Sequence, residues 1–220
     1  MSQIKERPIL FSAPMVRAIL EDRKTVTRRA VKVQPCSKAD IGSYGIGQPF
    51  IRNPNVSKAN PACPYGQPGD RLWVREAFGL QIRHYGGGTG EHIVYRATNP
   101  DAIYCKSAEG HEYPVKWKPS IHMPRYSSRI LLEITAVHVE RLQDISEEQA
   151  KAEGIVGVAF RPDDGWPICT GYMVGPDDGK SQLQTTAAGA FAGLWSSING
   201  QENWDANPWV WVVEFKRVTP

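Results

Sequence analysis

Two stretches of the chain carry apolar residues at helical spacing. In residues 14–22, Val16, Ile19 and Leu20 fall on one face, and a proline at position 14 suits a first helical turn. The second stretch ends at an Asn-Gly pair, which is typical of a helix end. Its apolar stripe consists of Ala187, Ala190, Phe191, Leu194, Trp195 and Ile198.

Four other runs predict strands, at residues 71–76, 92–97, 129–139 and 209–216. In the first of these, alternation places Leu72 and Val74 on the face opposite to Trp73. In the last, Trp209 and Trp211 share a face with further apolar residues. We therefore expect both of these tryptophans in the core.

Two shorter elements are predicted from local signals. Residues 25–27 are all β-branched and favour a strand directly after the first helix, which places the basic run 23–29 at a helix-to-strand junction. Ser146 and Gln149 have the spacing of a capping box, and Gly154 would end the helix that they begin.

The segments between these elements are rich in proline, glycine and asparagine. Residues 35–70 and 154–185 show no sustained period and are predicted to be long loops. No repeat and no obvious linker divides the chain, so one domain is expected over residues 1–220. The pattern predicts a mixed α+β class, with a small curved sheet or barrel and flanking helices.

Composition narrows the setting of this domain. No apolar run approaches the roughly 20 residues that a membrane-spanning helix needs, and the first residues are polar, so we expect a cytoplasmic protein without a membrane partner. The four cysteines are scattered, without a Cys-x-x-Cys pair. Ordinary reduced cysteines are therefore expected rather than a zinc site.

The net charge of +3 conceals an uneven distribution of charge. Residues 1–34 carry eight Lys or Arg against three acids, and residues 115–129 carry four bases and no acid. Residues 130–220 carry six bases against thirteen acids. The two basic segments would attract a polyanion or a phosphate if they meet in space; otherwise they form an unevenly charged solvated surface.

Lys24 and Thr27 are the candidate catalytic pair within the basic run. A hydroxyl becomes a useful nucleophile when a neighbouring base takes its proton, and a lysine can be that base when burial or nearby cations lower its pKa. In an extended segment the two side chains would point to opposite faces, whereas at a bend they could converge. Spacing alone favours a basic surface run over a catalytic pair.

The run Asp22-Arg23-Lys24-Thr25-Val26-Thr27-Arg28-Arg29 resembles the signature Gly-x-Lys-x-x-Glu-x-Arg of the ASCH family, a branch of the PUA-like barrel fold. Lys24 and Arg29 match it, whereas Asp22 stands where glycine is usual and Thr27 where glutamate is usual. Residues 116–125 and 207–211 resemble longer ASCH proteins carried by bacteriophages and prophages. The resemblance implies a PUA-like curved β-barrel with flanking helices, to which residues 35–66, 80–115 and 154–185 are insertions.

Thr27 is similar to a threonine of small bacterial ASCH enzymes, the N4-acetylcytidine amidohydrolases, which carry Lys-Thr-x-Thr-x-Arg at this point of the signature. The resemblance implies that Lys24, Thr27 and Glu153 are catalytic. Lys24 would accept the proton of Thr27, whose oxygen attacks the acyl carbonyl, and Glu153 would supply the leaving amine's proton and activate water. No metal and no cofactor is expected.

Further residues are candidates for holding the substrate, because interleaved aromatic and basic side chains can stack a base and hold a phosphate. They are Arg23, Arg29, Trp73, His122 and Arg125. Three functions remain open: an amidohydrolase for an acylated pyrimidine nucleoside or base, a non-catalytic module that binds RNA or a modified nucleotide, and a metal-independent ribonuclease. We favour the hydrolase; in each case the partner would be a nucleoside, nucleotide or RNA.

Overall fold

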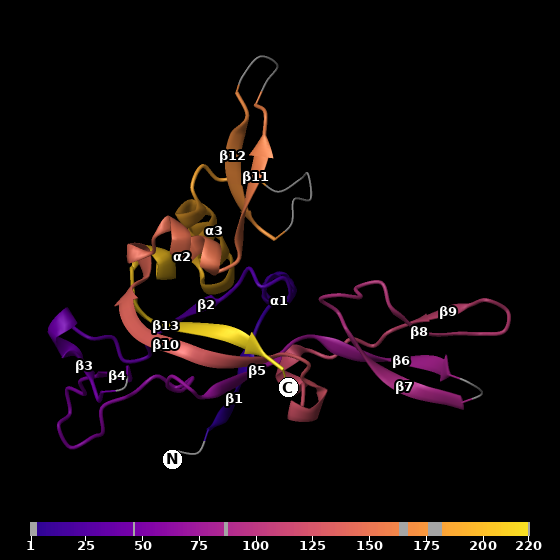
Figure 1. Ribbon diagram of the computed structural model, residues 1–220, viewed down its shortest axis with the longest axis horizontal. Helices are drawn as coiled ribbons and strands as arrows, with labels where there is room; N and C mark the ends of the chain where they lie inside the picture. Colours follow the sequence, from indigo (N-terminus) through magenta and orange to yellow (C-terminus); the bar gives the residue numbers. More distant parts are fainter. Residues whose placement is uncertain (1–3, 46, 86–87, 163–166, 176–181, 220) are drawn as a thin grey trace.

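A curved five-stranded sheet forms the centre of the protein (Figure 1). The computed structural model describes residues 4–45, 47–85, 88–162, 167–175 and 182–219. The strand order is β1 (Glu6–Leu10), β5 (Arg71–Arg75), β10 (Leu131–Arg141), β13 (Trp209–Val218) and β2 (Val26–Ala30). The β1–β5 pair is parallel and the other pairs are antiparallel. The mixed α+β class predicted from the sequence is confirmed.

Helices cover both faces of the sheet. The α1 helix (Ala13–Leu20) buries Val16 and Ile19 in the cluster that contains Trp211 and Phe215 of β13. On the other face, α2 (Glu147–Ala152) and α3 (Ala187–Asn199) pack in a second cluster with alternate residues of β13. Trp209 and Trp211 are buried, as predicted. Alternation along β13 therefore gives each face of the sheet its own core.

Local signals fix the helix ends. Ser146 and Gln149 form the predicted capping box at the start of α2, and the Thr186 side chain accepts a hydrogen bond from the backbone of Gly189 at the start of α3. Gly200, with φ of 93°, ends α3 and is followed by the short helix α4 (Gln201–Asp205). Single 3-10 turns occupy Lys38–Asp40, Ser120–His122, Arg125–Ser127 and Leu142–Asp144.

The two edges of the sheet approach each other without pairing. Within the described ranges, β1 and β2 are the edge strands, so no backbone ladder closes a barrel. Arg29 of β2 nevertheless donates from Nη2 to the carbonyl oxygen of Leu10 at 2.8 Å, and its guanidinium lies 5.5 Å from the ring centroid of Phe11. The sheet is therefore curved enough for side chains to connect its edges.

Four hairpins lie outside this sheet (Figure 1). They are β3 (Ile41–Ser43) with β4 (Pro49–Ile51), β6 (Phe78–Tyr85) with β7 (Gly88–Tyr95), β8 (Ile103–Lys106) with β9 (Glu112–Pro114), and β11 (Ile155–Phe160) with β12 (Cys169–Val174). The prediction that residues 35–70 and 154–185 are loops is wrong where β3, β4, β11 and β12 form. These strands are short, and β3, β11 and β12 contain glycine, so they lack the sustained period that identifies longer strands. Parts of 80–115 and 154–185 lie outside the described residues.

Candidate functional site

Lys24 lies in the turn between α1 and β2, and its side chain is fully buried. The backbone of the turn is held at Ala18, whose carbonyl oxygen accepts hydrogen bonds from the amides of Arg23 and Lys24. Lys24 Nζ donates to the carbonyl oxygen of Val26 at 2.8 Å and to that of Glu153 at 2.9 Å. The surface run favoured by spacing alone is therefore wrong, since Lys24, Thr27 and Arg28 are each only 2% exposed.

Glu153 supplies the carboxylate that faces this lysine. It is the C-terminal cap residue of α2, and its Oε2 accepts a hydrogen bond from Lys24 Nζ at 2.5 Å. Gly154 follows with φ of 102°, and a side chain there would bring Cβ within 3.0 Å of Ala18 Cβ. Glycine thus allows the chain to turn sharply beside α1, which brings together two residues 129 positions apart.

Arg28 extends the buried pair into a network. Its Nη1 donates to Oε1 of Glu153 at 3.2 Å, while Nε and Nη2 both donate to Oε1 of Glu140 at 3.0 and 2.6 Å. His138 Nε2 lies 3.3 Å from Oε2 of Glu140. Lys24 and Arg28 therefore face Glu153 and Glu140, so the two cations of the network are balanced by two carboxylates.

Burial sets the electrostatics of this network. Removal from water lowers the pKa of Lys24 below its ordinary 10.5 and outweighs the opposing attraction of Glu153. Burial by itself would raise the pKa of Glu140, but hydrogen bonding with His138 and the charge of Arg28 outweigh it, so that pKa lies below 4.5. The lysine is thus easier to deprotonate than a solvated one, which is what a lysine base requires.

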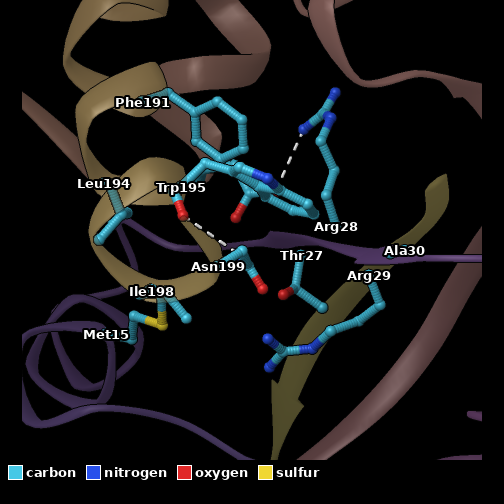
Figure 2. Close-up of a pocket in the computed structure, with 11 residues that line it drawn as sticks. Met15, Thr27, Arg28, Arg29, Ala30, Phe191, Leu194, Trp195, Ile198 and Asn199 are labelled. Carbon is cyan, nitrogen blue, oxygen red and sulfur yellow. Dashed lines mark hydrogen bonds and ion pairs between the residues drawn. The ribbon is translucent and has the colours of Figure 1, made fainter. Parts of the chain in front are cut away.

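A cavity of about 50 Å³ adjoins the network (Figure 2). Thr27, Arg28, Arg29 and Glu153 contribute polar groups to its wall, and α3 contributes Trp195 and Asn199 among other residues. Trp195 is 6% exposed, and its Nε1 has no hydrogen-bond partner in the described part of the chain. The cavity is far smaller than the roughly 300–1,000 Å³ of most small-molecule sites, so a nucleoside needs α3 or its side chains to move.

Thr27 occupies the wall of this cavity as the second residue of β2. Among the described residues none forms a hydrogen bond with its hydroxyl, and this includes Lys24. The Lys24 ammonium is instead occupied by Val26 and Glu153. The structure therefore brings Lys24 to Glu153, and Thr27 to the same cavity as Glu153, but leaves the proposed Lys24–Thr27 contact unmade.

Two of the three arginines predicted to hold substrate are already engaged near the turn. Arg23 donates to Oε2 of Glu21 from Nε at 2.8 Å and to the carbonyl oxygen of Gly154 at 3.2 Å. Arg29 lines the cavity while its guanidinium contacts Leu10. Arg23 thus helps hold the Gly154 turn, and Arg29 is the predicted substrate-binding residue that adjoins Thr27.

The other predicted substrate-binding residues lie away from the cavity; they are Trp73, His122 and Arg125. Trp73 lies on β5 with the guanidinium of Arg75 over its ring at 5.2 Å, and Arg75 also donates to the backbone of the turn that contains His122. Arg125 is paired with Glu6 of β1 at 2.8 Å. None of the three lines the cavity beside Thr27. They form a separate group at the β1–β5 side of the sheet.

The sequence did not single out Glu140 or Trp195 as site residues, and Arg28 appeared only as a member of the basic run 23–29. Glu140 was hidden because it lies just beyond the predicted strand 129–139, and Trp195 was expected on the core stripe of α3. Across the described ranges, no group of three or more His, Cys, Asp or Glu residues could hold a metal ion. No helix in the described part of the protein is long and apolar enough to span a membrane.

Comparison with protein-family models, with curated proteins and with solved structures found no match to this chain.

Proposed function

We propose that this chain is a member of the ASCH family, with a PUA-like sheet, and that it hydrolyses the amide of an acylated pyrimidine nucleoside or base related to N4-acetylcytidine. The observation that carries the proposal is the buried contact of Lys24 with Glu153 beside a cavity whose wall includes the Thr27 hydroxyl. A base, an acid and a nucleophile are thus available within one small region.

The reaction starts with a proton transfer inside the buried pair. When the Lys24 ammonium gives a proton to the Glu153 carboxylate, the lysine becomes the neutral amine that its burial favours. The neutral amine then accepts the proton of Thr27 as its oxygen attacks the acyl carbonyl. The neutral Glu153 carboxyl protonates the leaving amine of the base, which departs and leaves an acyl ester on Thr27.

Water completes the cycle. The Glu153 carboxylate takes a proton from a water molecule that attacks the ester, and the Lys24 ammonium returns a proton to the Thr27 oxygen. The net reaction is amide plus water to carboxylic acid plus amine. Arg28 holds the Glu153 side chain in position in both stages through Nη1. Thr27 must approach Lys24 when substrate binds, as catalytic hydrogen bonds often tighten only in the complex.

The backbone at Asp22 supports the family resemblance. Asp22 has φ of 55°, in the left-handed region that glycine adopts freely and that Asp tolerates better than most residues. Glycine is usual at this signature position, and the geometry explains why aspartate can replace it. The strong curvature of the sheet, which lets Arg29 reach Leu10, is likewise compatible with a barrel-like ancestor.

A binding module without turnover is the second candidate. The three hydrogen bonds of Lys24 favour it, because a fully bonded ammonium is a structural group until it loses a proton. In that case the network serves only to hold α2 on the sheet, and the cavity recognises a modified base without cleaving it.

An assay of the purified protein with N4-acetylcytidine separates these functions. We expect release of cytidine and acetate, measured by mass, and a loss of about 10²-fold or more in Thr27→Ala and Glu153→Gln. The matched control is Glu76→Gln, since Glu76 is another buried carboxylate, paired with Arg129 at 2.9 Å, and it does not line the cavity. Binding without release in the wild type would support the binding module instead.

A further inference from the structure

A second hollow is lined by residues of the hairpins β6–β7 and β8–β9 and of the segment after β9. Figure 1 shows these two hairpins together at the right of the molecule. The hollow is a groove of about 520 Å³, within the usual range for a ligand site. Its lining residues, here called the tyrosine groove, are Leu80, Tyr104, Tyr113, Pro114, Lys116 and Lys118. None of them lines the cavity beside Thr27.

The walls of the tyrosine groove are fixed by backbone contacts. The segment after β9 is tied to β6 by hydrogen bonds between the backbones of Phe78 and Lys118, at 3.2 and 2.7 Å. Gly79 permits this close approach, because a Cβ there would lie 2.2 Å from Cγ1 of Val115. Gln81 Nε2 donates to the carbonyl oxygen of Ile103 at 2.9 Å and joins the two hairpins. The groove is therefore preformed.

The side chains of the groove combine flat apolar surfaces with positive charge. Tyr113 is 46% exposed, and Tyr104 is half-buried with its hydroxyl donating to Glu91 at 3.1 Å, which holds that ring in place. Lys116 and Lys118 are exposed, and neither forms an ion pair with any residue in the described ranges. Among the residues that the structure describes, no acid lines the groove.

We propose that the tyrosine groove binds single-stranded nucleic acid. A base would stack on a tyrosine ring while neighbouring phosphates bind Lys116 and Lys118, the combination that sequence-tolerant single-strand sites use. An acidic peptide would satisfy the lysines but leave the apolar floor uncovered. A duplex keeps its bases stacked inside and offers no free face to the tyrosines. This site is independent of the proposed hydrolysis.

Fluorescence anisotropy with a labelled twelve-nucleotide oligouridine, and with oligothymidine in parallel, tests the proposal. We expect binding to weaken as salt is raised, with a smaller salt dependence in Lys116→Ala/Lys118→Ala. Loss of one stacking ring in Tyr113→Ala should weaken binding at least about fivefold. Preference between the two oligonucleotides distinguishes RNA from DNA as the ligand.

Matched surface variants serve as controls. Tyr126 is 85% exposed and Lys58 is exposed, and both lie outside the groove, so Tyr126→Ala and Lys58→Ala should bind as the wild type does. The proposal is overturned if the groove variants bind as these controls do, or if polyglutamate competes as well as oligouridine. Release of acetate from N4-acetylcytidine should be unchanged in the groove variants, so failure here and failure of the proposed function are distinguishable.

Discussion

Replacing Lys24 by methionine tests how the buried network contributes to folding. The substitution keeps an unbranched apolar chain of similar length but removes the ammonium, so Glu153 retains Arg28 as its charged partner, at 3.2 Å. Removal of one partner from a buried ion pair costs about 3–5 kcal/mol, because the other charge is left without compensation. The remaining arginine places Lys24→Met near the lower end, at about 3 kcal/mol.

Urea unfolding followed by tryptophan fluorescence measures this loss, since the chain has seven tryptophans. The decisive comparison is the double variant Lys24→Met/Glu153→Gln, in which an uncharged amide replaces the Glu153 carboxylate. We expect it to be more stable than Lys24→Met alone, with a coupling of about 1–3 kcal/mol. If the double variant loses as much unfolding free energy as Lys24→Met and Glu153→Gln lose together, the two residues are not a coupled buried pair. Lys58→Met, at an exposed position, should change stability by less than about 0.5 kcal/mol.

The difference in unfolding free energy between the wild type and Lys24→Met should depend on pH, because Lys24 gains or loses a proton. Since burial lowers the pKa of Lys24 in the folded protein below 10.5, the unfolded chain binds more protons in the interval between the two values. Raising the pH through that interval therefore favours folding of the wild type relative to Lys24→Met. A difference in unfolding free energy that stays constant up to pH 10.5 would contradict the lowered pKa.

Three further predictions concern single side chains. The indole N–H groups of Trp195 and Trp209 both lack a hydrogen-bond partner among the described residues, and only Trp195 lines the cavity. Trp195→Phe should therefore change the melting temperature no more than Trp209→Phe does, while lowering turnover of N4-acetylcytidine. Equal turnover in the two variants would exclude a substrate-binding role for the indole. Burial would raise the pKa of Asp70, but its hydrogen bonds outweigh burial and hold that pKa below 3.8. Asp70→Asn should therefore lower the free energy of unfolding by about 2 kcal/mol at pH 7. Urea titrations should show this loss shrinking as the pH falls below 3.8. Burial raises the pKa of the Cys63 thiol to about 11. Iodoacetamide at pH 8 should therefore alkylate the exposed Cys36 and spare Cys63, which peptide mass analysis measures. Equal labelling of the two cysteines would contradict the burial of the Cys63 thiol.

The helices and strands of the central sheet region could be predicted from sequence because the signals for them are local. The stripe of α3, the capping box of α2 and the alternation of β5 each lie within a dozen residues, and each predicted element forms. The hairpin β11–β12 was missed because its strands combine apolar residues with glycine and pair with each other rather than with a core strand.

The candidate site could be predicted from sequence only in part, because the contacts that form it join residues far apart in the chain. A basic run is usually solvated, and burial of Lys24 depends on Glu153, which is 129 positions away in the chain. The resemblance suggested both residues but gave no reason for Arg28 to join them. Its role follows from pairing of β2 with β13, which lies beside β10 and therefore brings Arg28 to Glu140.

The side-chain contact between the sheet edges also bears on self-association. Unpaired edge strands present carbonyl groups to which a strand of another molecule can add. Here the carbonyl oxygen of Leu10 on β1 accepts from Arg29, and that of Val26 on β2 accepts from Lys24. The cations near the proposed reaction thus also occupy one carbonyl group on each edge strand, which removes that acceptor from an incoming strand. Light scattering should accompany every assay of variants at these two positions, because aggregation would imitate a loss of catalysis.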